Sequence, residues 1–252
     1  MWKRVLASVA GTSHTKSDLP CQDHSIVDLI NDFAEQDYLV CLVSDGAGSA
    51  RNGGIGAEIA CKTALFNIQL TINKQQSSYL DANSVKEWIL AVQTAIQQKA
   101  TSKQLTSRDY ACTLLGTVIA KAQALFFQIG DGAIIASSGY AQGVVFWPEA
   151  GIYANMTHFV TEADALTHLN ILITKSYIDE IALFSDGIQR LALVYENQTP
   201  YLPFFDPMLE IMRNKSQAEC IELDKQLAIF LNSHEINKRT DDDKTLILAT
   251  RR

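Results

Sequence analysis

Three apolar segments of this chain end in Asp-Gly, and these aspartates are the residues best placed to do chemistry. They are Asp45 after residues 38–44, Asp131 after residues 125–130, and Asp186 after residues 181–185. A fourth acidic run, residues 241–243, precedes an apolar segment. Carboxylates held at the ends of buried strands can converge on one spot, where they repel one another unless cations separate them. The pattern therefore favours a divalent-metal site.

A turn is the competing interpretation of each Asp-Gly, because Gly readily adopts positive φ and Asp bonds to its own backbone. One copy would not decide between the two interpretations, but three copies and a triple Asp favour metal binding. Such a site would use residues near positions 45, 131, 186 and 242. We therefore expect residues 1–252 to form a single domain.

The chemistry of such a site follows from its oxygen ligands. Mg²⁺ and Mn²⁺ prefer carboxylate and carbonyl oxygens and keep several waters. A carboxylate that bridges two ions, with other carboxylates beside it, forms a two-metal centre that can orient water and a phosphoryl group. Asp45 is the expected bridge, because flexible Gly46 can also turn its carbonyl oxygen to a metal. Asp186 and Asp242 are the expected flanking ligands.

The elements that must position these residues can be predicted from the hydrophobic pattern. Strands are expected over 5–10, 25–27, 38–45, 113–120, 125–129, 133–136, 181–185 and 245–249, and helices over 55–66, 84–100, 207–212 and 216–231. Ser84 and Glu87 match a capping box at the start of the second helix. The short connections after residue 112 indicate antiparallel neighbours. The order predicts an α+β fold, a four-layer α-β-β-α sandwich with two mostly antiparallel sheets between helices.

Composition excludes several classes of protein. A net charge of −7 argues against a nucleic-acid partner, since phosphate backbones are bound by clustered Lys and Arg. No run is apolar for long enough to span a bilayer, and the N-terminus lacks a secretory core. The five scattered cysteines form no C-x-x-C pair. We expect a cytoplasmic protein with reduced thiols and no membrane partner.

Six short motifs together resemble those of metal-dependent serine/threonine protein phosphatases of the 2C type, closest in style to the bacterial branch. In chain order they are PCQD (20–23), SDGAG (44–48), CTL (112–114), IGDG (129–132), FSDG (184–187) and DDDKT (241–245). The resemblance implies a manganese- or magnesium-dependent hydrolase that removes phosphate from phosphoserine or phosphothreonine. Its partners would be a phosphorylated protein substrate and, in signalling, an opposing serine/threonine kinase.

The resemblance also implies a role for each acidic residue. Asp45 would bridge two metals, and the Gly46 carbonyl would bind one of them. Asp186 and Asp242 would hold the other, and Asp23 would act through a metal-bound water. Asp131 matches an acidic residue associated with a third, weaker metal site. In the implied mechanism a hydroxide bridging the two metals attacks phosphorus in line with the leaving oxygen.

The chain departs from the family pattern in four places. Gln22 replaces an acidic residue, and Asp243 replaces a common Asn. Ala47 replaces the His proposed as general acid in eukaryotic members, so the leaving group must be protonated by a metal-bound water or another group. The N-terminal phosphate-binding Arg has no clear counterpart. Its candidate replacements are His14, Lys16 and Arg51.

Two other functions stay open on the sequence. A non-catalytic relative could keep this fold as a binding or regulatory module, and a related metal phosphohydrolase could act on a small molecule. Retention of the main Asp ligands favours catalysis. Residues 139–172 occupy the place of a variable segment beside the cleft in related phosphatases, and we expect them to help select the substrate.

Overall fold

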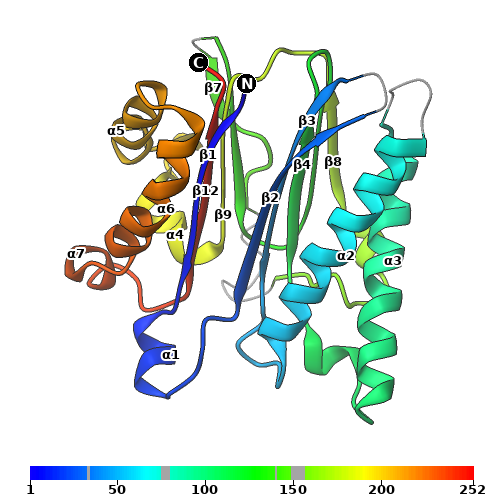
Figure 1. Ribbon diagram of the computed structural model, residues 1–252. Coiled ribbons are helices and arrows are strands. Elements are labelled where there is room, and N and C mark those ends of the chain that lie inside the picture. Colours follow the sequence, from blue (N-terminus) through cyan, green and yellow to red (C-terminus); the bar gives the residue numbers. More distant parts are fainter. Residues whose placement is uncertain (33–34, 75–79, 140, 149–156) are drawn as a thin grey trace.

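In the computed structural model of this protein, two five-stranded antiparallel sheets lie face to face between two groups of helices (Figure 1). The structure describes residues 1–32, 35–74, 80–139, 141–148 and 157–252. The first sheet contains, in order, β1 (Lys3–Val9), β12 (Lys244–Thr250), β9 (Glu180–Phe184), β6 (Ala133–Ser138) and β7 (Ala141–Val144). The second contains β2 (Asp23–Asn31), β3 (Asp37–Asp45), β4 (Leu114–Ile119), β5 (Ala124–Ile129) and β8 (Asn170–Thr174).

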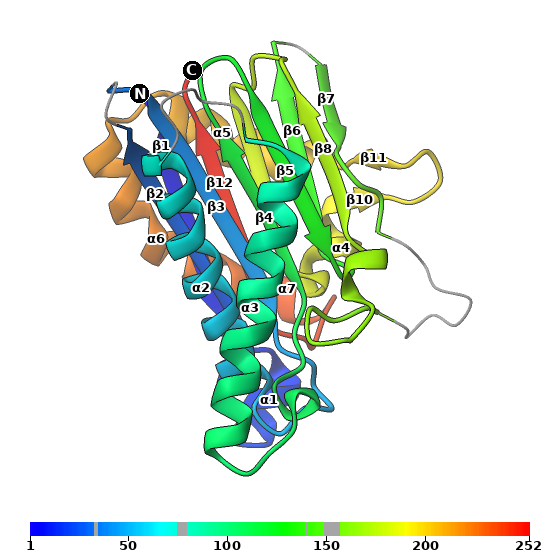
Figure 2. The same cartoon turned by 90° about the vertical axis from the view of Figure 1, so that its right-hand side faces the viewer.

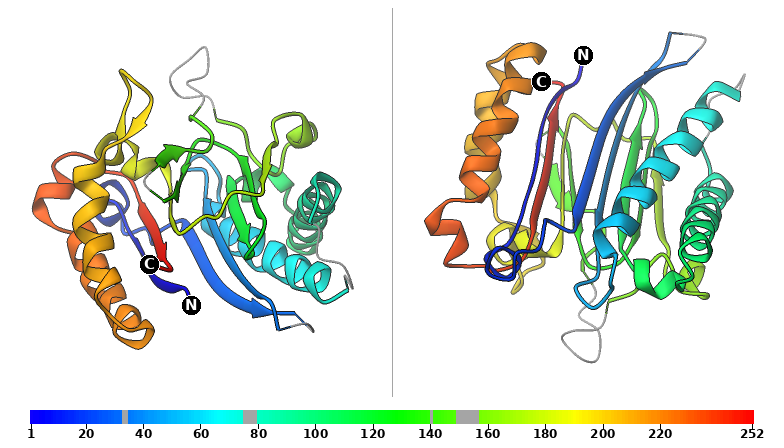
Figure 3. Two further views of the ribbon diagram at one scale, coloured as in Figure 1. Left: turned by 90° about the horizontal axis from the view of Figure 1, so that it is seen from above. Right: turned by 60° about the horizontal axis from the view of Figure 1, so that its bottom comes forward.

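Long helices cover the outer face of each sheet. The pair α2 (Gly53–Lys74) and α3 (Ala82–Ser102) packs on the second sheet, as Figure 2 shows. The first sheet is covered by α4 (Asp186–Ala192), α5 (Leu202–Arg213), α6 (Gln217–Leu231) and α7 (His234–Asn237). The views in Figure 3 show the resulting four layers. The predicted α-β-β-α sandwich is therefore confirmed.

Shorter elements connect these layers. They are α1 (Thr12–Lys16), two 3-10 turns (Ser107–Tyr110 and Ala165–Thr167), and the hairpin of β10 (Leu193–Val194) and β11 (Thr199–Pro200). All five cysteines are unpaired, as expected. No helix of the described ranges has the length and apolar character needed to cross a membrane. That residues 1–252 act as one domain stays a prediction.

The strands nearest the site are apolar along most of their length because both of their faces are buried. In β3, Val40 and Leu42 pack under α2 and α3, while Cys41 and Val43 face the other sheet. In β12 the same alternation places Leu246 and Leu248 under the first sheet's helices and Ile247 between the sheets. An uninterrupted apolar run of this kind is typical of a strand buried on both faces. The strand ends are thus held on rigid supports.

Two predicted helix starts are wrong. Helix α3 begins at Ala82, and its N-cap is Asp81, whose Oδ1 accepts from the backbone N of Ser84 at 2.8 Å. Ser84 was expected to be the N-cap. Instead it lies inside the helix, where its hydroxyl donates a second hydrogen bond to the Asp81 cap, at 3.0 Å. Helix α5 begins at residue 202 instead of 207, because a proline is tolerated in the first turn of a helix and Pro203 lies there.

Candidate metal centre

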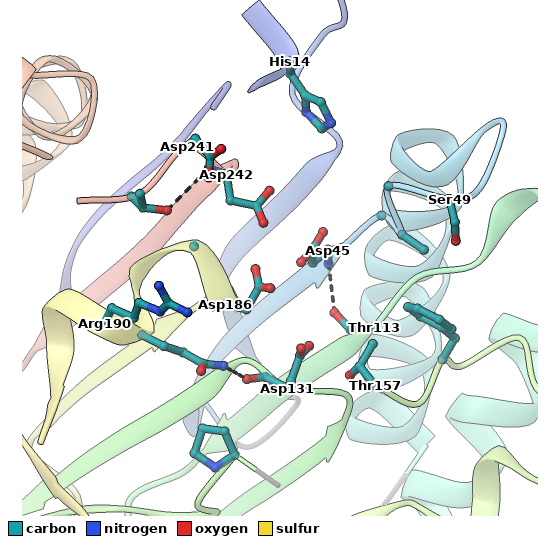
Figure 4. Close-up of a pocket in the computed structure, with 18 of the residues that line it drawn as sticks. His14, Asp45, Ser49, Thr113, Asp131, Thr157, Asp186, Arg190, Asp241 and Asp242 are labelled. Carbon is teal, nitrogen blue, oxygen red and sulfur yellow. Dashed lines mark hydrogen bonds between the residues drawn. The ribbon is translucent and has the colours of Figure 1, made fainter. Parts of the chain in front are cut away.

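A pocket of about 830 Å³ opens at one end of the sandwich, where strand ends of both sheets meet. Five aspartates line it, and four of them are the predicted metal ligands, from distant parts of the chain (Figure 4): Asp45 ends β3, Asp131 follows β5, Asp186 begins α4, and Asp242 precedes β12. The fifth is Asp241. The carboxyl groups of the first four face one another across the pocket. The structure therefore brings together the four carboxylates that line the predicted site.

Asp45 is held by its neighbour on the next strand. Thr113 accepts from the backbone N of Asp45 through its hydroxyl at 3.0 Å, and its own backbone N donates to the Asp45 carbonyl at 2.8 Å. These two bonds fix the backbone of Asp45 and leave its carboxyl free to face the pocket. Burial raises the pKa of the Asp45 carboxyl well above its usual range, and the nearby carboxyls of Asp23 and Asp186 raise it further.

The glycines after Asp45 and Asp186 allow two backbone segments to pack closely. The turn interpretation of Asp-Gly would instead require these glycines to have positive φ. Among the described glycines, only Gly130 and Gly139 have positive φ. A Cβ on Gly46 would lie 2.3 Å from the carbonyl carbon of Gly53, and one on Gly187 would lie 2.0 Å from the Asp243 carbonyl oxygen. Two backbone segments meet closely behind each aspartate, which only Gly allows. Gly46 and Gly187 also line the pocket.

Asp23 lies next to Asp45 in the second sheet, since the two residues are paired in the register of β2 and β3. It is buried and is not among the residues that line the pocket. The Ser185 hydroxyl donates to Asp23 Oδ2 at 2.6 Å. Burial raises the pKa of Asp23 to about 6, although the hydrogen bond from Ser185 lowers it. Asp23 is therefore a supporting carboxyl behind Asp45 in this structure.

Burial and neighbouring carboxylates also raise the pKa values of Asp131 and Asp186, the other two strand-end aspartates. Burial raises the pKa of Asp186 to about 7, with Asp131 and Asp242 adding repulsion. Burial also raises the pKa of Asp131, whose backbone carbonyl accepts a hydrogen bond from the Gln189 amide. Without a cation, each of these groups resists ionisation because no positive charge compensates it.

The donor set fits hard divalent cations. Asp23 Oδ1 and Asp186 Oδ1 are buried and have no hydrogen-bond partner among the described residues. Such buried acceptors are rare unless a water or an ion completes them. No three acidic, His or Cys side chains of the described part are gathered closely enough to enclose one ion. Mg²⁺ and Mn²⁺ prefer carboxylate and carbonyl oxygens such as those at this pocket and keep several waters.

Of the three residues predicted to bind the substrate phosphate, only one lines the pocket. His14 lines the pocket, but Lys16 and Arg51 are exposed and are not among its lining residues. Two other arginines line it, Arg190 on α4 and Arg239 before β12. Figure 4 shows the Arg190 side chain extending towards Asp186. Asp186 lies one helical turn before Arg190 in α4. That i, i+4 spacing was visible in the sequence, whereas nothing there marked Arg239.

The two-sheet sandwich is shared with solved serine/threonine phosphatases. One is the catalytic domain of the serine threonine protein phosphatase PstP in complex with two manganese ions, with a TM-score of 0.64 and 13% identity over 99% of this chain and 97% of that one. Another is the serine/threonine phosphatase Stp1 from Staphylococcus aureus, with a TM-score of 0.58 and 14% identity over 100% and 96%. These likenesses show the fold.

The sequence comparisons identify the family. The family model described as protein phosphatase 2C matches residues 10–232. Serine/threonine-protein phosphatase 3 of Escherichia coli (strain K12) is 39% identical over 252 residues, which cover 98% of each chain. This chain therefore belongs to the protein phosphatase 2C family of metal-dependent serine/threonine phosphatases. It is an enzyme that acts on phosphoproteins, as the motif resemblance implied.

Proposed function

We propose that this enzyme hydrolyses phosphoserine and phosphothreonine at the pocket between the sheets, using Mn²⁺ or Mg²⁺ held by Asp45, the Gly46 carbonyl, Asp186 and Asp242. The observation that carries the proposal is the convergence of these carboxyls, two of which have pKa values raised by burial and mutual repulsion. When bound, two such ions supply a water of lowered pKa as nucleophile and positive charge for the phosphoryl oxygens. Asp131 would serve a third, weaker ion.

The protein's own residues would fix the geometry of the reaction. Asp45 is held by Thr113, and Asp23 stands behind it, held by Ser185. This rigid backing would keep the carboxyl positions unchanged as substrate binds. A pocket already in the reactive arrangement stabilises developing charge without reorganisation.

Arg190 is the side chain proposed to bind the substrate phosphate. It lines the pocket, and it has no ion pair or hydrogen bond with another residue of the described ranges. A guanidinium can donate two parallel hydrogen bonds to phosphate oxygens. Arg190 would thus take the part predicted for His14, Lys16 or Arg51.

The surroundings of the pocket support a protein substrate over a small metabolite. Pro148, Thr157 and Phe159, which belong to the predicted selectivity segment, line the pocket. Residues 140 and 149–156 of that segment lie outside the described residues. A wide pocket with a lining from a connecting segment can accept an extended phosphopeptide. A serine/threonine kinase would act in opposition, in a cytoplasmic setting.

Hydrolysis assays test the proposal. A phosphothreonine peptide, p-nitrophenyl phosphate and a panel of small phosphometabolites are incubated with Mn²⁺, Mg²⁺ or a chelator. We expect metal-dependent turnover with the peptide preferred, and loss of that turnover in Asp45→Asn and Asp242→Asn. Asp206→Asn, on the exposed side of α5, is the control and should keep full activity. Equal activity in all three variants would refute the site assignment, and failure on every substrate would refute the proposed reaction at this pocket.

A further inference from the structure

His14 is held in the pocket by a carboxylate that is not one of the proposed metal ligands. Its Nδ1 lies 2.8 Å from Asp243 Oδ1, and 15% of its side chain is exposed. A carboxylate acceptor requires that Nδ1 carry the proton, so the second ring nitrogen, Nε2, is the one available to a substrate. Nε2 has no hydrogen-bond partner within the described ranges.

The ring is held from several directions. Asp243 also accepts from the backbone N of Gly11 at 2.7 Å and from that of Gln22 at 2.5 Å. Beside His14, the backbone N of Ser13 donates to the Asp241 carbonyl at 2.9 Å. A Cβ on Gly11 would lie 2.3 Å from that same carbonyl oxygen, so α1 packs tightly on the segment before β12. The imidazole is therefore presented by a rigid support.

Position and residue type both suit proton transfer to a leaving group. Among the described residues that line the pocket, His14 is the only imidazole, and Figure 4 shows it on the side of Asp242 and Asp45. The phenol of Tyr195 is engaged, since it donates to Gln189 at 2.8 Å, and the Ser and Thr hydroxyls of the lining are much weaker acids than an imidazolium. Ala47, which follows Gly46 in the pocket lining, has no side-chain proton to donate.

We propose that His14 is the general acid of the phosphatase reaction and that Asp243 is its positioning residue. As an oxygen derived from water bonds to phosphorus, the bond from phosphorus to the serine or threonine oxygen breaks. Its electron pair stays on that oxygen, which takes the proton from His14 Nε2. The products are a neutral hydroxyl group and inorganic phosphate, and the imidazole regains its proton from solvent. The Asp243 carboxylate fixes the tautomer and the orientation of the ring.

Leaving-group dependence tests this role, which rests on the proposed phosphatase function. A serine alkoxide is a poor leaving group and needs a proton, whereas p-nitrophenolate leaves without one. We expect His14→Asn to lower kcat on a phosphoserine peptide by about 10²-fold or more, as general acids commonly contribute. The loss on p-nitrophenyl phosphate should be at least about ten-fold smaller. Asp243→Asn should show the same bias with a smaller loss, and free imidazole should partly restore peptide turnover by His14→Gly.

The control is His234→Asn, whose side chain is exposed on α7 and outside the pocket lining. It should match the wild type on both substrates. Equal losses on both substrates in His14→Asn would overturn the general-acid role, since a phosphate-binding or purely structural residue would act on both. No loss on either would also overturn it. If the wild type itself hydrolyses neither substrate, the phosphatase proposal fails first.

Discussion

The Ser185 hydroxyl donates a 2.6 Å hydrogen bond to Asp23 Oδ2 and so joins the two sheets beside the pocket. Ser185 follows β9 of the first sheet, and Asp23 begins β2 of the second. The hydroxyl oxygen of Ser185 also accepts a hydrogen bond from the backbone N of Thr245, at 3.1 Å. One hydroxyl therefore satisfies a buried carboxylate and a buried amide at the point where the sheets must stay in register.

Removing that hydroxyl should cost stability. Ser185→Ala leaves Asp23 and the Thr245 amide without this partner, and an orphaned buried polar group costs about 1–3 kcal/mol. We expect a lower free energy of unfolding of that order in urea denaturation, together with weaker Mn²⁺ binding by calorimetry. Ser102→Ala, at the exposed end of α3, is the control. Equal stability of the two variants would show that the Ser185 bond contributes little.

Neutralising a pocket aspartate should stabilise the metal-free protein while it destroys activity. The pKa of Asp186 is raised to about 7 by burial and by Asp131 and Asp242. Since one pKa unit corresponds to about 1.4 kcal/mol, Asp186→Asn should gain roughly 1–3 kcal/mol at neutral pH in chelator, after loss of its favourable place at the start of α4. Chemical denaturation measures the gain, and a phosphopeptide assay measures the lost turnover. A destabilised variant would contradict this account of the site.

The metal-free protein should lose stability as the pH rises from about 4 to about 7. The pKa values of Asp23 and Asp186 are raised to about 6 and about 7 in the folded state, from 3.8. In that window the folded state holds protons that the unfolded chain has released, so stability falls with pH until both groups are ionised. Above it the cost stays constant.

Mn²⁺ should reverse this trend, because it compensates the ionised carboxyls and competes with protons. We expect the rise in Tm on adding Mn²⁺ to be larger at pH 7.5 than at pH 5, measured by thermal unfolding in matched buffers. The same comparison in Asp186→Asn should show a smaller difference. A rise that is independent of pH would separate metal binding from these carboxyls.

Substitution of Arg190 should weaken substrate binding more than it slows chemistry. Arg190→Ala removes a charge-assisted pair to phosphate worth about 1.5–3 kcal/mol, so KM for a phosphopeptide should rise roughly 10-fold to 100-fold. Lys16→Ala and Arg51→Ala are matched controls, because both side chains are exposed and outside the pocket lining. If either control raises KM as much as Arg190→Ala, the phosphate contact lies elsewhere.

Gly187→Ala should be among the most damaging single-methyl changes. Its Cβ would lie 2.0 Å from the Asp243 carbonyl oxygen and 3.3 Å from the Asp242 Cβ. The backbone must shift, which typically costs about 1–3 kcal/mol and would displace Asp242. Gly143→Ala, where an added Cβ meets nothing within 4 Å, is the control. We expect lower Tm and lower metal affinity only for the first variant.

The strand-end aspartates could be predicted from the sequence. An apolar run indicates a buried strand, and the residue at which the run stops marks the end of that strand. Asp45 and Asp186 lie where this reasoning placed them. The start of α3 was missed because both Asp81 and Ser84 are good caps, and only the structure shows which one accepts the hydrogen bond.

Contacts between distant segments were beyond local patterns. His14 and Asp243 are separated by 229 positions, and their pairing depends on how α1 packs beside β12. Replacement of Asn by Asp at position 243 gave a hint that was not connected with His14. The close packing at Gly46 and Gly187 was not predicted, since close approach of two backbones cannot be seen until both segments are placed.

The central place of β12 in the first sheet has a consequence for synthesis. This strand lies between β1 and β9, and Asp242 and Asp243 directly precede it. A growing chain on the ribosome lacks the strand that joins those neighbours until residues 244–250 have emerged, even though the helices that precede them can already form. Before residues 242–250 are available, the first sheet lacks its central connection and the pocket lacks Asp242, so we expect no metal-dependent turnover from such a chain.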